Sequence, residues 1–204
     1  MIRDVLVWLQ TQLGKGPDEY AMSWSEQLLG SLNFWGLLEG THLLSLMLFA
    51  GTIFVVDLRL LGVTFRKTPV SELSRRVLPL TVFGFVLVIL TGLALFYAKP
   101  LVYYHNIWFR AKLAFIVLAL VNIMVFHRRV QRNISAWDNL ARPPAAARAS
   151  AVISLASWAL IIMLGRFIAY DWFECGKPLP DWANALQECA ASEKGAQTLA
   201  ELAQ

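Results

Sequence analysis

Residues 37–56 of the chain read LLEGTHLLSLMLFAGTIFVV, and this stretch decides the fold. It is mostly apolar and long enough to cross about 30 Å of hydrocarbon as a helix that rises about 1.5 Å per residue. Three similar runs follow at residues 78–97, 107–126 and 151–170. Of the 204 residues, 57% are hydrophobic. We therefore expect an all-α integral membrane protein, a bundle of four spanning helices in the lipid bilayer.

The positions of the basic residues predict the orientation of this bundle. Most of them lie in two loops, the first between the first and second runs and the other between the third and fourth. Basic loops face the cytoplasm in membrane proteins, so both termini are expected on the opposite, periplasmic side of a bacterial inner membrane. The two loops carry Arg59, Arg66, Lys67, Arg75, Arg76, Arg128, Arg129, Arg132, Arg142 and Arg148.

Two segments flank the predicted membrane domain, which we place at residues 31–173. Residues 1–30 are expected to be periplasmic and to begin with an amphipathic helix on the membrane surface, because apolar residues recur there at helical spacing. Ser23 and Glu26 have the spacing of a capping box, which predicts a helix that begins near Trp24 and leads toward the first span. Residues 174–204 form the expected periplasmic C-terminal tail.

The two cysteines of the chain, Cys175 and Cys189, both follow the fourth apolar run. Their side of the membrane is predicted to be oxidising, which favours a disulfide. Such a bond would close a loop of about 15 residues and contribute about 3 kcal/mol in the chain-entropy model. Two free thiols are the alternative.

Ionisable side chains inside membrane helices are costly and are therefore candidates for function. In this chain they gather toward the predicted outer side of the first, third and fourth runs. Counted along each helix, His42, Lys112 and Arg166 lie at a similar depth. On the third run, Trp108 shares a helix face with His105 and Lys112. We expect a polar pocket in the outer half of the bundle, formed by Glu39, His42, His105, Trp108, Arg110, Lys112 and Arg166.

Haem b is the cofactor that this pocket predicts. A haem between bundle helices needs one or two axial ligands and cationic partners for its propionates. His42 is the expected axial ligand, with His105 or a deprotonated Lys112 on the opposite face, and Arg110 and Arg166 are the expected propionate partners. The chain has no CxxCH sequence for covalent attachment, so the haem would be b-type.

Two other interpretations of the same residues remain open. They could form a purely structural polar network, or they could carry ions or protons, with copper binding as a variant. His127 is interpreted as a structural residue at the end of the third span. Asp57 with Arg59 is interpreted as an interfacial pair, and Asn122 as a hydrogen-bonding residue between helices.

Several segments resemble a family of uncharacterised bacterial four-helix membrane proteins. They are EGTHLLSLMLFAGTIFVVDLRLLG, LPLTVFGFVLVILTGLALF, WFRAKLAFIVLALVNIMVFHRR and GRFIAYDWFE, and the resemblance covers about residues 35–173. More remotely, His42 and the WFRAK stretch with Lys112 are similar to HemJ-type protoporphyrinogen oxidases and to the CopD copper-resistance family. The HemJ resemblance implies that His42 and Lys112 matter for haem binding.

Together these observations predict a b-type haem protein of the bacterial inner membrane. It would pass electrons between the quinone pool and a periplasmic or membrane redox partner, with no nucleic acid involved, and it would be an oxidoreductase or a subunit of one. A HemJ-like oxidase of porphyrin precursors is one alternative. The other is a transporter or accessory membrane subunit without haem.

Overall fold

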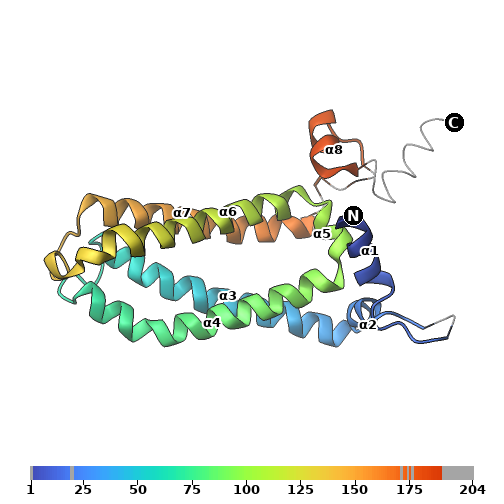
Figure 1. Ribbon diagram of the computed structural model, residues 1–204, viewed down its shortest axis with the longest axis horizontal. Coiled ribbons are helices and arrows are strands. Elements are labelled where there is room, and N and C mark those ends of the chain that lie inside the picture. Colours follow the sequence, from blue (N-terminus) through green and yellow to red (C-terminus); the bar gives the residue numbers. More distant parts are fainter. Residues whose placement is uncertain (1, 19–20, 171, 174, 176, 190–204) are drawn as a thin grey trace. The chain divides into compact units, whose positions relative to one another are not determined.

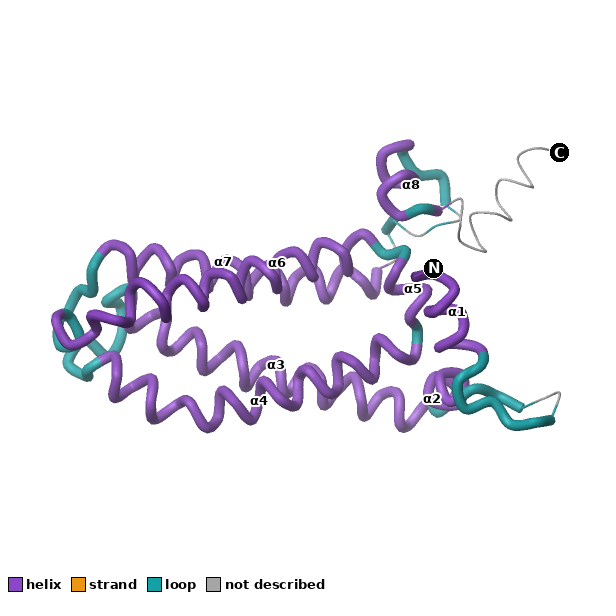
Figure 2. The backbone as a smooth tube through the Cα atoms, viewed as in Figure 1, coloured by secondary structure: helices purple, strands orange, loops and turns teal. Residues whose placement is uncertain are grey.

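The computed structural model describes residues 2–18, 21–170, 172–173, 175 and 177–189. Within these residues the named elements are helices, joined by short loops (Figures 1 and 2). Part of the predicted C-terminal tail, residues 190–204, lies outside the described residues.

Four long helices are apolar enough to cross a membrane, which confirms the predicted all-α membrane fold. The first two helices extend beyond the apolar runs at both ends, and the fourth begins before its run. The third helix ends in a π-helical turn, Phe126–Val130, and a short 3-10 helix, Gln131–Ala136. The four are α3 (Leu32–Leu60), α4 (Val70–Ala98), α6 (Ile107–Val125) and α7 (Ala145–Phe167), the last continued by the 3-10 turn Ile168–Tyr170.

The chain divides into two compact units, and we describe each by itself. The central unit comprises residues 37–93 and 114–161, which hold most of the four long helices and the two basic loops. The terminal unit comprises residues 1–36, 94–113 and 162–204, which hold the short helices and the remaining ends of the long ones.

In the central unit, α3 and α4 approach each other closely at Gly84. A Cβ atom added to Gly84 would lie 2.9 Å from the backbone nitrogen of Phe49, so only glycine fits without a shift. The Phe49 ring packs against Trp158 of α7 edge to face, with ring centroids 4.8 Å apart, and against Phe85 of α4 at 5.4 Å. Small residues at such crossings let membrane helices gain van der Waals contact, which is what drives their association in lipid.

Side-chain hydrogen bonds join the helices of the central unit at two further levels. The Thr81 hydroxyl of α4 donates to the Thr52 hydroxyl of α3 over 2.8 Å. On the other pair of helices, Asn122 Nδ2 donates to the Ser150 carbonyl and the Ser150 hydroxyl donates back to Asn122 Oδ1, each over 3.0 Å. The predicted role of Asn122 as a hydrogen-bonding residue between helices is therefore confirmed.

Arg59, near the end of α3, is fully buried and holds the two basic loops of the central unit together. Its Nε donates to the Thr68 carbonyl over 2.8 Å, and its Nη2 donates to the carbonyls of Asp138 at 3.3 Å and Leu140 at 3.1 Å. The interpretation of Arg59 and Asp57 as an ion pair is wrong, because the guanidinium binds backbone carbonyls. Those carbonyls lie in the two loops, and the Asp138 carbonyl also accepts from the Val70 nitrogen over 3.3 Å.

The N-terminal segment of the terminal unit contains the two helices that the sequence predicts. These are α1 (Ile2–Thr11) and α2 (Trp24–Gly30), and α2 begins with the expected capping box of Ser23 and Glu26. Ser25 anchors α2 by donating to the Ala98 carbonyl at the end of α4 over 3.0 Å. The helix that starts at Trp24 ends at Gly30, so it does not run unbroken into the first span.

The α1 helix buries only Leu6, whereas Ile2, Val5 and Trp8 are exposed. An exposed row of apolar side chains is what a helix on the membrane surface requires. The location of α1 at the membrane surface stays a prediction.

Replacing Gly84 with alanine is expected to destabilise the protein by about 1–3 kcal/mol, the usual effect of overfilling a packed contact. Gly51 is the matched control, because a Cβ there has nothing within 4 Å. Gly51→Ala should be neutral or stabilising by up to about 1 kcal/mol, since alanine is the better helix former. Unfolding of both variants in detergent tests this, and equal stability would contradict the close approach of α3 and α4.

Candidate functional site

His42 is the eleventh of the 29 residues of α3 and forms a hydrogen bond with α4. Its Nδ1 is 2.9 Å from the Thr91 hydroxyl, and that hydroxyl donates its single hydrogen to the Leu87 carbonyl over 2.7 Å. With the Thr91 hydrogen directed to Leu87, the hydroxyl oxygen accepts from His42, and the tautomer that satisfies both bonds carries its hydrogen on Nδ1. In a neutral imidazole, Nε2 is then the unprotonated nitrogen, and an unprotonated ring nitrogen is the atom that binds a metal.

Gly92 makes room for the His42 ring on α4. A Cβ added to Gly92 would lie 3.2 Å from His42 Cε1, tighter than an ordinary contact. Next to the histidine along α3, Ser45 is buried and its hydroxyl donates to the carbonyls of Thr41 and His42. The imidazole is therefore hydrogen-bonded to Thr91 and lies close to the backbone of α4 at Gly92.

Glu39 does not take part in this arrangement. It lies one turn before His42 on α3, but its side chain is exposed. The hydrogen bond that orients the histidine joins it to Thr91 of α4 instead.

Lys112 of α6 reaches across to α7 within the terminal unit. Its Nζ would lie 3.4 Å from a Cβ added to Gly165, so the glycine leaves space beside the ammonium group. Trp108, one turn earlier on α6, packs against Phe167 with ring centroids 5.2 Å apart and against Phe173 at 5.6 Å. The indole nitrogen of Trp108 is buried without a hydrogen-bond partner.

Arg166 lies one residue after Gly165 on α7, and its side chain is exposed. Its guanidinium carbon is 4.9 Å from the ring centroid of Tyr170, within the range of a cation–π contact.

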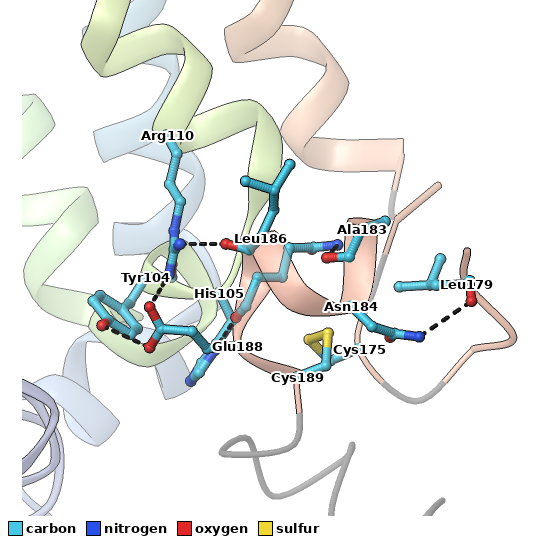
Figure 3. The surroundings of a disulfide bond; sticks show 11 residues. Tyr104, His105, Arg110, Cys175, Leu179, Ala183, Asn184, Leu186, Glu188 and Cys189 are labelled. Atoms are coloured by element: carbon cyan, nitrogen blue, oxygen red, sulfur yellow. Dashed lines mark hydrogen bonds and ion pairs between the residues drawn. A yellow bond between two sulfur atoms is a disulfide. The ribbon is translucent and has the colours of Figure 1, made fainter. Parts of the chain in front are cut away.

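His105 and Arg110 bind the segment that follows α7, as Figure 3 shows. The Nδ1 of the buried His105 donates to the Gln187 carbonyl over 2.7 Å. Arg110 donates from Nε to the Tyr104 carbonyl over 2.9 Å and from Nη1 to the Leu186 carbonyl. These bonds fix the end of α8 (Asp181–Gln187) against the start of α6.

Glu188 adds two charged contacts at the same place (Figure 3). One carboxylate oxygen lies 3.5 Å from Arg110 Nη2, and the other accepts a hydrogen bond from the Tyr104 hydroxyl over 3.0 Å. The hydrogen bond to Glu188 raises the pKa of Tyr104 above its usual 10.0. Since the tyrosine must be protonated to donate, this contact is present at neutral pH and is lost only as the pH rises past that raised value.

The predicted disulfide between Cys175 and Cys189 is present, and it closes the loop that contains α8. Cys189 directly follows the residues that Tyr104, His105 and Arg110 bind. We define residues 175–189, held by this disulfide, as the C-terminal cap.

The structure thus distributes the predicted site residues over three settings. His42 is oriented by Thr91 in the central unit, Lys112 and Trp108 line the contact of α6 with α7 in the terminal unit, and His105 with Arg110 holds the C-terminal cap. The described residues contain no group of three or more His, Cys, Asp or Glu side chains that could bind a metal ion.

Sequence reasoning missed Thr91 and the cap residues Gln187 and Glu188. Thr91 is a single hydroxyl in an apolar run, and nothing in its neighbourhood connects it with a histidine 49 positions away. The partners of His105 and Arg110 are mostly backbone carbonyls, which any residue type supplies. Exposed His127 is bonded to the Ile123 carbonyl of its own helix over 2.9 Å, as expected of a structural residue.

Comparison with known proteins places residues 31–171 in a family of unknown function, DUF6644. The match spans the four long helices and more than half of the chain, so the chain belongs to this family. No curated protein and no solved structure matches the chain.

Removing the disulfide should release the C-terminal cap. For a separation of 14 residues, the chain-entropy model gives a loss of about 3 kcal/mol. Cys175→Ser combined with Cys189→Ser is therefore expected to speed hydrogen exchange of the α8 amides, measured by mass spectrometry, and a reductant should do the same to the wild type. Reductant should have no further effect on the double variant. Unchanged exchange in α8 would contradict the role of the disulfide.

Proposed function

We propose that this protein is a b-type haem protein of the bacterial inner membrane, with both termini in the periplasm. It passes electrons between the quinone pool and a periplasmic or membrane redox partner. A bound haem supplies a centre that accepts and releases one electron. The residues of the chain bind this group, orient it and neutralise its charge.

The observation that carries the proposal is the hydrogen bond between His42 and Thr91. Histidines that ligate a metal commonly donate their other ring N–H to a neighbouring acceptor, which fixes the tautomer and the ring orientation. His42 has this arrangement inside a membrane helix, where a polar side chain without a role is rare. Gly92 adds the space in which the imidazole sits.

The cations of the terminal unit support the same cofactor. Lys112 has a glycine beside its ammonium group, and the exposed guanidinium of Arg166 is suited to a carboxylate such as a propionate. His105 and Arg110 are engaged with the C-terminal cap. That Lys112 is the second ligand and Arg166 the propionate partner stays a prediction from the sequence. The quinone and the redox partner stay predictions from the membrane location and the cofactor.

The optical spectrum of the protein purified from membranes tests haem binding directly. The wild type is expected to show a Soret band, and His42→Ala should lose it because the axial ligand is gone. His127→Ala is the matched control, since this exposed histidine bonds only within its own helix. Wild-type protein without a Soret band, or a band that survives His42→Ala unchanged, would overturn the proposal.

Thr91→Val removes the hydroxyl that accepts from His42 while keeping the shape of the side chain. Loss of such a partner typically weakens cofactor affinity by about 10–100-fold. Thr81→Val is the control, because Thr81 lies on the same helix and also donates to a carbonyl one turn earlier, but bonds Thr52. Haem titration of both variants measures the difference. Equal affinities would show that Thr91 does not orient the ligand.

A further inference from the structure

The two basic loops of the central unit meet to form one surface. We define the two-loop surface as residues 62–69 and 137–144. Arg59 bonds carbonyls in both loops, as described above, and a Cβ added to Gly62 would lie 2.8 Å from the Ala141 carbonyl oxygen. The two loops therefore pack directly against each other, and the buried guanidinium of Arg59 bonds to both of them.

Exposed cations cover this surface and the helix ends beside it. Asp138 and Glu72 are the nearby acids, and the Asp138 carboxylate is already bonded to the backbone and hydroxyl of Ser71. Among these cations, and within the described part of the chain, only Arg76 is ion-paired, with Glu72. The exposed cations are Arg66, Lys67, Arg75, Arg76, Arg128, Arg129, Arg132, Arg142 and Arg148.

Large apolar side chains are exposed between these cations. Val63 is 60% exposed, Phe65 54% and Leu140 51%. Phe65 directly precedes Arg66 and Lys67 in the sequence, and Leu140 is two residues from Arg142. Apolar side chains flanked by cations are typical of segments that bind the charged interface of a membrane.

The backbone of Phe65 supports a role for this exposed ring. Its φ is +51°, a left-handed conformation that a bulky side chain rarely adopts and that favours glycine or asparagine. The Phe65 carbonyl accepts from the Thr68 nitrogen over 2.9 Å, so the turn is closed in this conformation. Strained residues of this kind gather at sites of function, and 54% of the Phe65 surface is exposed.

We propose that the two-loop surface binds anionic phospholipid headgroups. Arg66, Lys67 and Arg142 contact the phosphates, and Val63, Phe65 and Leu140 enter the interfacial layer. Charge complementarity selects the occupant, since a cationic surface with few acids attracts anionic lipid. The surface is also continuous with helices that are long and apolar enough to cross a membrane. This inference does not depend on haem.

The test compares lipids added to the detergent-purified protein, with the number of bound lipids counted by native mass spectrometry. Phosphatidylglycerol is expected to bind more tightly than phosphatidylcholine, and the difference should shrink at high salt, which screens exposed charge. Arg66→Gln with Lys67→Gln should weaken phosphatidylglycerol binding by about fivefold per residue removed. Arg3→Gln with Lys15→Gln, which removes the same charge from the terminal unit, should leave it unchanged.

A second variant separates lipid binding from folding. Phe65→Gly relieves the backbone strain, so it should keep or raise the thermal stability in detergent while weakening phosphatidylglycerol binding. Equal binding of the two lipids would overturn the proposal, as would equal losses in the two double variants. Displacement of the lipid by inorganic phosphate at similar concentration would identify a free-anion site instead. If Phe65→Gly leaves phosphatidylglycerol binding unchanged, the Phe65 ring does not enter the interfacial layer, and that part of the proposal is wrong.

Discussion

A polar group inside hydrocarbon has no water to bond with, so it must find its partner within the protein. Most of the contacts between helices described above follow from this constraint. Thr52 meets Thr81, Asn122 meets Ser150, and His42 meets Thr91. Each pair joins two helices at a fixed height, which sets how the helices align along their axes. Because apolar side chains pack almost as well against lipid as against each other, these pairs supply specificity that hydrophobicity cannot.

The same constraint explains the buried guanidinium of Arg59. Two loops at the end of the central unit contribute carbonyls that regular helix bonds do not satisfy, and one planar cation satisfies several of them. A lysine could not replace it equally, since its ammonium group cannot present donors in several fixed directions. Because Arg59 holds both loops from their buried side, the cations and large apolar side chains of the loops remain exposed.

The C-terminal cap is held differently, because it belongs to the segments outside the spans. A disulfide restricts the loop, and carbonyls at the end of α8 accept from His105 and Arg110. The sequence predicted both residues as part of the polar pocket, yet their donors are directed to the C-terminal cap. Of the predicted pocket residues, His42 has the most definite geometry.

The sequence alone determined the four spans, the capping box of α2, the disulfide and the hydrogen-bonding role of Asn122. The spans and the capping box depend on the local spacing of residue types along the chain. The disulfide depends on there being only two cysteines, which can pair in one way. Only the tertiary structure decided that Thr91 orients His42, that Arg59 binds loop carbonyls instead of Asp57, and that Arg110 holds the cap. Such partners are distant in the sequence and are often backbone atoms. A donor at a known position can reach many such acceptors, and the packing of the helices selects among them.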